Sequence, residues 1–281
     1  MCPPPSEASP EPGESGPRDD AGTVFTKDPP APAPVPAPTP TERPPLSSGR
    51  SDALIGWAMV ALVLLGLGAS SWLAWNLERA GTVSFWVYVI APTLVVAVVA
   101  LARAVRDGEA FEMVRPEWGD ATRGILSAVL LLGATVACLH VMAPTGSPRE
   151  SWVARIYLQL GDPRWLRAHN GLIGAAILVA AAAEEIVWRG LVTRLIAERV
   201  GSRSAWVWAA LCYALAQVPT AWALRDPEAG LNPMLILGAL GLGLVWGGMA
   251  RWTRRLAPSV LSHAGFTWCV VMLFRLWGAG V

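Results

Sequence analysis

The sequence is poor in charged residues, histidine and cysteine. Of its 281 residues, 15% are charged, three are His and four are Cys, and the net charge is +1. An ordinary soluble domain has about 25% charged residues. The shortage of charge therefore excludes a simple soluble enzyme and a disordered regulator. The nearly neutral balance also excludes a nucleic-acid-binding protein with a basic face.

Common hydrolase and metal-binding motifs are also missing. No HExxH, GxSxG or CxxC motif occurs, so the sequence does not indicate a zincin, a serine hydrolase or a zinc ribbon. The four cysteines have no paired spacing, and we interpret them as small apolar residues. The glycine-rich run 238–248 lacks the Gly-Lys-Ser/Thr ending of a phosphate loop. The spacing of Gly243 and Gly247 instead favours close helix packing.

Proline is concentrated in the first part of the chain. Residues 1–50 contain 15 of the 24 prolines, and residues 29–40 nearly alternate Pro and Ala. Because proline interrupts helices, we predict a disordered tail at 1–50 with a bias to polyproline II, acting as a tether or spacer. We do not expect a signal peptide there, since no basic start is followed by an apolar stretch. Residues 51–281 are predicted to form a transmembrane helical domain.

What the sequence has in excess is long apolar runs. Hydrophobic residues make up 53% of the chain, and residues 53–77 contain no charge. About 20 apolar residues span a bilayer as a helix. We predict an all-α, polytopic transmembrane helix bundle with about seven spans, and an interfacial helix at 151–167 where apolar and charged residues alternate. The predicted spans are residues 53–77, 84–101, 124–143, 168–194, 205–224, 233–250 and 256–274.

Arginines near the ends of the predicted spans indicate an orientation. With the N-terminus inside, twelve of these arginines lie on the cytoplasmic side and six on the opposite side. Cytoplasmic loops of membrane proteins carry an excess of Lys and Arg. We therefore expect a multi-pass protein of the cell (plasma) membrane with a cytoplasmic N-terminus.

Two carboxylates and an arginine interrupt the fourth predicted span: Glu184, Glu185 and Arg189. Each charge at the bilayer centre costs about 2.5–3.5 kcal/mol on insertion scales, so such residues pair or face a cavity. The i,i+4 spacing of Glu185 and Arg189 favours an ion pair on one helix face. The side chain of Glu184 points about 100° away from that of Glu185 around the helix axis, and it has no oppositely charged partner in this helix. We predict Glu184 as a general base or acid, the alternative being that both acids only bond to neighbouring helices.

Other polar residues lie at a similar depth in later spans. Gln217 in the fifth span and His263 in the seventh each lie about 4–5 Å from the span centre, as does Glu184 in the fourth. His263 and Thr267 are on the same helix face. We predict one shared site from these residues, whereas Tyr213 is expected to pack in the core.

The first of these motifs resembles the CPBP family of intramembrane proteases, which includes CAAX prenyl endopeptidases and bacterial Abi-like proteins. The family's motif EExxxR is matched in full by Glu184, Glu185 and Arg189. The resemblance covers about residues 165–277, which we take as the CPBP-like core.

The two later motifs of the family are matched in part. The aromatic-xxx-His motif reads Tyr213-x-x-x-Gln217, with glutamine where histidine is expected. The HxxxN motif reads His263-x-x-x-Thr267. The histidine missing from the second motif normally helps to orient or deprotonate the attacking water. Gln217 can form hydrogen bonds to that water but cannot take up its proton.

The resemblance implies a membrane-embedded endopeptidase. Glu184 would activate a water for attack on a peptide carbonyl, and Glu185 with Arg189 would hold the site together. His263 would stabilise the developing oxyanion, assisted by Thr267. The implied substrate is a membrane-associated peptide or protein, for example a C-terminal anchor segment, and the lipid bilayer is the other expected partner.

Several alternatives stay open on the sequence alone. A catalytically impaired CPBP-like protein would bind a membrane partner in immunity or as a scaffold, and a transporter would use the acid pair for protons. CPBP proteins have been described both as metallo- and as glutamate-type proteases. With one histidine missing, we expect no tightly held cofactor, the alternative being weak binding of a divalent metal such as zinc. We expect no nucleic-acid partner, and the sequence indicates no oligomeric state.

Overall fold

The structure, a computed structural model, describes residues 50–273, with side chains from residue 54 onward. The predicted disordered tail lies outside the described residues, except for Arg50, which begins the first helix. Within residues 50–273 the regular structure is helical, apart from an isolated β-bridge between Asp226 and Gly230. The all-α prediction is confirmed.

Within residues 50–273, five helices are long and apolar enough to cross a membrane, and the protein is a multi-pass membrane protein. Four are α1 (Arg50–Ala74), α2 (Val83–Arg106), α4 (Asp120–Met142) and α11 (Met234–Thr253). The fifth is the continuous stretch Asn170–Val200, which consists of α7 (Asn170–Glu185), the π-helix η2 (Ile186–Val192) and α8 (Thr193–Val200). These helices coincide with the first, second, third, fourth and sixth predicted spans.

The two other predicted spans are shorter or interrupted. Residues 205–224 form α9 (Ala205–Ala216) and α10 (Val218–Ala223), which are separated at Gln217. Pro219 explains the break, because proline has no N–H to donate and disfavours helical backbone at the residue before it. The predicted span 256–274 contains α12 (Ala257–Trp268) and the π-helix η3 (Cys269–Leu273), which together are shorter than the five long helices.

The predicted interfacial helix at 151–167 is also divided. Its first part, α5 (Glu150–Leu160), ends at Gly161, whose φ of 97° is a backbone conformation that favours glycine. Its second part, α6 (Pro163–Ala168), begins after Asp162, whose side chain accepts a hydrogen bond of 2.8 Å from the Arg164 N–H. The remaining short helices are η1 (Leu77–Arg79) and α3 (Ala110–Val114).

The helices pack in pairs around two larger apolar cores, and a third, smaller core forms around Leu166, Ile173 and Ile177. α11 packs along α9, α12 along α4, and α1 along α2. One core surrounds η2, where Val187 and Val192 are fully buried against α1, α2 and α9. The other larger core joins α4, α11 and α12 through Leu131, Trp246 and Phe266. The π-helix that directly follows the two adjacent carboxylates is therefore enclosed by other helices.

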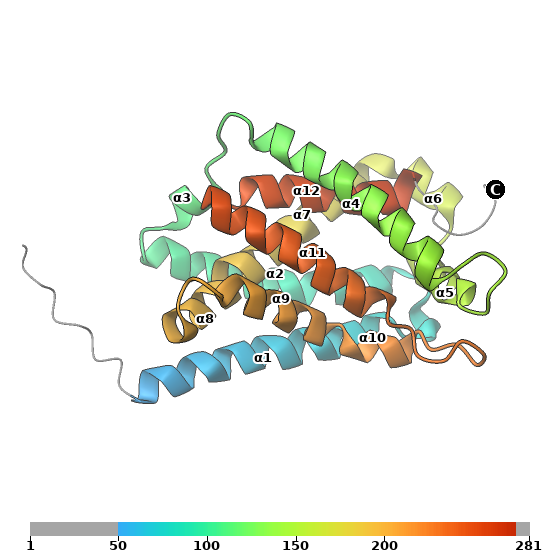
Figure 1. Cartoon of the computed structure of the whole chain (residues 1–281), viewed down its shortest axis with the longest axis horizontal. Coiled ribbons are helices and arrows are strands. Elements are labelled where there is room, and N and C mark those ends of the chain that lie inside the picture. The colour runs from blue at the N-terminus through green and yellow to red at the C-terminus, as the bar shows by residue number, and fades with distance from the viewer. Residues whose placement is uncertain (1–49, 274–281) are drawn as a thin grey trace, which may run out of the picture. The chain divides into compact units, whose positions relative to one another are not determined.

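Different short helices lie at the two ends of the helix bundle. Figure 1 shows α3 and α8 at one end, together with the end of α11 and the start of α12, and α5, α6 and α10 at the other. Between these ends the outward faces are apolar: Leu62 of α1 and Val98 of α2 are 72% and 66% exposed. An exposed apolar surface of this kind suits contact with lipid.

Gly124 lies where α4 packs tightly against α12. A Cβ at this position would stand 2.8 Å from the Cβ of Leu261 and 3.1 Å from the carbonyl oxygen of Pro258. We expect Gly124→Leu to force the two helices apart and to lower the free energy of unfolding by about 1–3 kcal/mol, the usual cost of overpacking. Unfolding of the purified protein in detergent measures this change.

Gly133 of α4 supplies the matched control, because a Cβ there would meet nothing within 4 Å. Gly133→Leu adds the same side chain to the same helix and should leave the free energy of unfolding nearly unchanged. Equal destabilisation by both substitutions would contradict the close approach at Gly124.

Candidate active site

The two adjacent carboxylates lie where an α-helix changes into a π-helix. Glu184 and Glu185 are the last residues of α7, and Arg189 lies in the following π-helix η2. Nη1 of Arg189 donates a hydrogen bond of 3.1 Å to Oε1 of Glu185, so the two charges form the ion pair that their spacing indicates. Single π-helical turns inside α-helices occur often at functional sites.

Glu185 joins three helical segments through one carboxylate. It is fully buried, and its Oε1 is bonded to Arg189 and to Nδ1 of His263 at 2.9 Å. Its other oxygen, Oε2, is buried and has no hydrogen-bond partner among the residues that the structure describes. Arg189 also reaches α11, where Nη2 donates to the carbonyl oxygen of Gly243 at 3.4 Å. Glu185 therefore ties α7 to η2 and to α12.

His263 of α12 is held in a defined orientation. Its ring stacks on Trp246, with the ring centroids 3.9 Å apart and the planes at 17°. Nε1 of Trp246 donates to Oγ of Ser262 at 3.0 Å, which also fixes the indole. Because Glu185 occupies Nδ1 of His263, its Nε2 is the remaining polar atom of the ring, and it makes no hydrogen bond to residues 54–273.

Glu184 has a different partner from its neighbour. The hydroxyl of Tyr213 in α9 donates a hydrogen bond of 2.7 Å to Oε2 of Glu184. The guanidinium of Arg189 lies over the Tyr213 ring at 5.2 Å from its centroid. The prediction that Tyr213 only packs in the core is therefore incomplete: its ring is buried, but its hydroxyl contacts the carboxylate. The i,i+4 spacing of Tyr213 and Gln217 was the signal in the sequence.

One cavity brings together four of the predicted site residues. It has a volume of about 270 Å³, and its lining includes Glu184, Gln217, His263 and Thr267. Glu185 and Arg189 do not line this cavity and contact the lining residues from behind. The structure thus separates the six predicted residues into four that a substrate could reach and two that hold their neighbours.

The side chains of Gln217 and Thr267 stand free in this cavity wall. Neither makes a hydrogen bond to any residue of the described helices and loops. Gln217 lies at the break between α9 and α10, and Thr267 is one turn after His263 on α12. Both can offer hydrogen bonds to a bound molecule, and Gln217 offers both donors and an acceptor.

Part of the cavity wall comes from helices to which the sequence assigned no role in the site. Ser71 of α1 and Tyr88 and Thr93 of α2 line it, opposite residues from the second half of the chain. Trp246 of α11 also lines it. These residues were missed because a serine, a tyrosine or a tryptophan in an apolar run carries no distinctive spacing. Only the folded arrangement of the helices reveals their position.

The donor atoms at this site do not fit a zinc centre. Catalytic zinc has three protein ligands, usually His, Cys, Asp or Glu. Within residues 54–273 no group of three such side chains could hold a metal ion. Glu185 is already bonded to Arg189 and His263. This leaves Glu184 and Nε2 of His263 as the donors that face the cavity, which are too few.

Part of the chain matches the model of a known protein family. Residues 168–269 match the family model described as type II CAAX prenyl endopeptidase Rce1-like. The matched segment begins in α6 and ends at the start of η3, so it contains all six predicted site residues. It leaves out α1 and α2, which supply the opposite wall of the cavity. Neither a curated protein nor a solved structure matches the chain.

Proposed function

We propose that this chain, whose residues 168–269 form an Rce1-like type II CAAX prenyl endopeptidase domain, is an intramembrane endopeptidase. It hydrolyses a peptide bond of a membrane-associated peptide or of a C-terminal anchor segment. The observation that carries the proposal is the cavity in which Glu184 and His263 face the same space, with Glu184 in a helix long and apolar enough to cross a membrane. The fixed ion pair behind them supports the same conclusion.

In this proposal Glu184 is the general base. Its carboxylate accepts a proton from a water molecule in the cavity, and the oxygen of that water attacks the peptide carbonyl carbon. Glu184 then returns the proton to the amine that leaves. The Tyr213 hydroxyl at 2.7 Å orients the carboxylate and leaves its other oxygen available to the water. Gln217 positions the water through its amide without taking the proton.

The proposed role of His263 is to stabilise the tetrahedral intermediate. Nδ1 is bonded to Glu185, so Nε2 is the ring atom that faces the cavity, and an Nε2–H there is a hydrogen-bond donor. This donor stabilises the negative charge that develops on the carbonyl oxygen. The Thr267 hydroxyl, one turn further along α12, adds a second donor. Stacking on Trp246 keeps the imidazole from rotating away.

Hydrolysis by an activated water has a direct chemical test. Purified protein in liposomes, given a membrane-anchored peptide in heavy-oxygen water, should release a product whose new carboxylate contains one heavy oxygen. Since the site lacks three metal ligands, incubation with EDTA should leave the rate unchanged. Mass spectrometry of the products measures both. Absence of cleavage across a panel of anchored peptides, or loss of activity on chelation, would contradict the proposal.

A second candidate function rests on Gln217. A glutamine at this position favours a non-catalytic protein that binds a membrane partner in the same cavity, because glutamine cannot accept the proton of a water. The substitution Gln217→His separates the two functions. If the native protein is a protease, we expect Gln217→His to change the existing rate by about tenfold or less, because Glu184 remains the base.

Activity that appears only in the Gln217→His protein would instead favour the binding function for the native chain. Both proteins are compared in the same liposome assay. Gln159→His is the control for an added imidazole, because Gln159 is buried outside the cavity lining. Its rate should follow the fraction of protein that remains folded.

We also propose that the protein lies in the cell membrane with a cytoplasmic N-terminus. Helix α2 ends at Arg106 and α11 contains Arg251 near its end, and both ends belong to the arginine-rich side. The excess of arginine on this side supports the orientation. Labelling of single cysteines introduced at Glu78 and at Arg115, on opposite sides of α2, with a membrane-impermeant reagent would test it.

A further inference from the structure

A second cavity lies next to the ion pair, at the end of the bundle that holds α3 and α8. It has a volume of about 420 Å³ and is lined by residues of α3, η2, α8, α9 and α11 and by the segment before α12. Its charged lining residues are Glu109, Glu112, Arg189, Arg194, Arg251, Arg254 and Arg255. The lining thus contains five arginines and two glutamates, and three of the arginines, Arg189, Arg194 and Arg255, are paired with carboxylates. The first cavity, by contrast, has no arginine in its lining.

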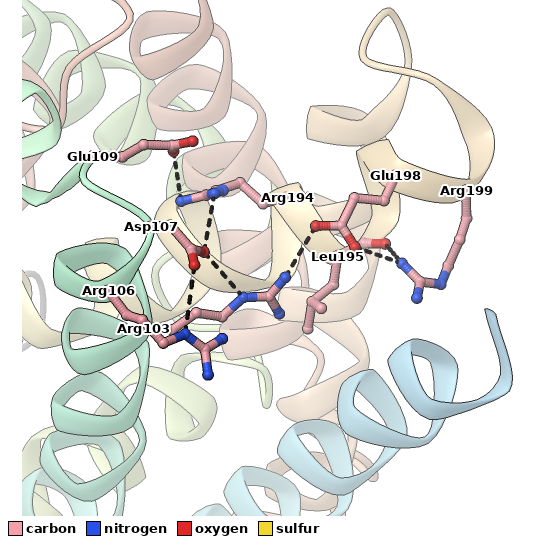
Figure 2. Close-up of polar contacts among 8 residues, drawn as sticks. All are labelled: Arg103, Arg106, Asp107, Glu109, Arg194, Leu195, Glu198 and Arg199. Carbon is pink, nitrogen blue, oxygen red and sulfur yellow. Dashed lines mark hydrogen bonds and ion pairs between the residues drawn. The ribbon is translucent and has the colours of Figure 1, made fainter. Parts of the chain in front are cut away.

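Arg194 is one of the arginines of this cavity that are neutralised by carboxylates. Figure 2 shows it between Glu109 and Asp107, at 2.7 Å and 3.6 Å. Around it, Arg103 contacts Asp107 and Glu198, so that α2 and α8 are joined by alternating charges. The arginines of this network are paired with carboxylates, so they attract a further anion only weakly.

Two other arginines of the cavity have no carboxylate partner within residues 54–273. Nη1 of Arg251 donates only to backbone carbonyl oxygens, those of Ser202 and Arg203. Arg254 makes no hydrogen bond or ion pair to the described residues, and it is exposed. Arg255 is paired with two carboxylates, those of Glu117 and of Asp120 (2.9 Å), and only its Nε is buried without a hydrogen-bond partner among the described residues. Unmatched guanidinium donors therefore gather on one side of the cavity.

The backbone conformation at Arg254 is unusual, and it lies within this group of arginines. Arg254 has a φ of 59°, and among the described residues it is the only non-glycine residue with a positive φ. Such a conformation costs of order 1–3 kcal/mol in a residue other than glycine. Arg254 lies in the short turn between α11 and α12. Residues 251–255 contain three arginines, at positions 251, 254 and 255.

The cavity lies at the level where the membrane-spanning helices end. α11 ends at Thr253, and the stretch Asn170–Val200 ends beside the cavity residue Ala197. Trp252, next to these arginines, is 78% exposed. Tryptophan is enriched at membrane–water interfaces, and basic pockets between membrane helices bind the head groups of anionic lipids.

We propose that this second cavity binds the phosphate of an anionic phospholipid, with Arg251 and Arg254 as its principal donors. A guanidinium group presents paired N–H donors that match phosphate oxygens. Inorganic phosphate shares this chemistry, but the position at the span ends and the apolar lining residues Trp206 and Leu256 favour a lipid. The lipid's glycerol and first methylenes lie against these two side chains.

Native mass spectrometry of the purified full chain in detergent tests the proposal without any need for catalysis. With phosphatidylglycerol we expect a retained one-lipid complex. With phosphatidylcholine at the same concentration we expect a complex at least about tenfold weaker, because its choline ammonium neutralises the phosphate and repels the arginines, which offsets about one charge-assisted contact. The double substitution Arg251→Gln/Arg254→Asn should weaken phosphatidylglycerol binding by at least about tenfold. Asn is chosen at 254 because it tolerates a positive φ.

Arg106→Gln/Arg115→Gln is the matched control. It removes two positive charges from the same end of the protein, outside the cavity lining. This variant should bind phosphatidylglycerol within about twofold of the native protein, the expectation for charges that only attract at a distance in salt solution. If both double variants weaken binding equally, or neither does, the cavity is not the lipid site.

Two further measurements complete the test. The single variant Arg254→Asn removes an unpaired, exposed side chain, so it should fold like the native protein while binding phosphatidylglycerol more weakly. Excess inorganic phosphate should leave the lipid complex intact. Displacement of the lipid by phosphate would overturn the proposal and show that the cavity binds a free anion. If Arg254→Asn binds phosphatidylglycerol with native affinity, Arg254 is not a donor to the lipid phosphate.

Discussion

The substitution Glu184→Gln should reduce the rate of peptide hydrolysis by about 10²–10⁴-fold, the usual contribution of a general base. Glutamine has nearly the same size and can still accept the hydrogen bond from Tyr213, but its amide cannot take a proton from water. Initial rates in liposomes, measured by mass spectrometry at saturating peptide, give the effect on kcat. Peptide binding should change little, since the cavity keeps its shape.

Two further variants test whether the loss of hydrolysis rate is specific to the carboxylate of Glu184. Glu78→Gln makes the same chemical change at an exposed position in η1, outside the cavity, and should leave the rate unchanged. Tyr213→Phe removes only the orienting hydroxyl and should lower the rate less than Glu184→Gln does. An active Glu184→Gln protein would show that another group activates the water, and it would end the proposed role of Glu184.

The second large effect is expected on stability and comes from the neighbouring residue. Glu185→Gln removes the charge that compensates Arg189 inside the protein, where the Arg189 side chain is 4% exposed and that of Glu185 is fully buried. Breaking a buried ion pair from one side costs about 3–5 kcal/mol, because the other charge stays behind unpaired. The free energy of unfolding, measured by denaturant titration in mixed micelles, should fall by about this amount.

Glu184 provides the comparison within the same helix. Glu184→Gln alters the adjacent residue in the same chemical way, but Glu184 is not in an ion pair, so its effect on unfolding should be much smaller. The double substitution Glu185→Gln/Arg189→Met removes both charges and should recover most of the lost stability. Activity should stay low in this protein, because His263 loses the carboxylate that holds Nδ1. Equal stability of all three variants would show that the ion pair does not support the fold.

The core of the candidate site could be predicted because its residues are close in sequence. Glu185 and Arg189 are four residues apart on one helix, and helix geometry alone places them on the same face. Charges within an apolar span must also be paired or lie in a cavity, so their position in the chain already marks them as candidates. The same logic distinguished Glu184, whose direction leaves it without a partner in its own helix.

The break between two helices at Gln217 was harder to predict from the sequence. The apolar run 205–224 looks continuous by hydropathy, yet the structure divides it into α9 and α10. The proline two residues later carried the necessary information, since it removes one backbone donor and restricts the residue before it. Depth estimates that assume one straight helix were therefore inexact for Gln217, although the structure places it in the same cavity as Glu184 and His263.

The sequence by itself determined that this is a helical membrane protein and which few polar residues lie within its spans, because hydropathy and helix spacing are local properties. Only the tertiary structure decided the partners of those residues: Tyr213 on Glu184, Trp246 stacked on His263, and a cavity wall from α1 and α2. It also decided which arginines are neutralised and which are not. Contacts between distant segments depend on how helices pack, and in lipid, packing follows shape and small residues more than any repeating sequence pattern.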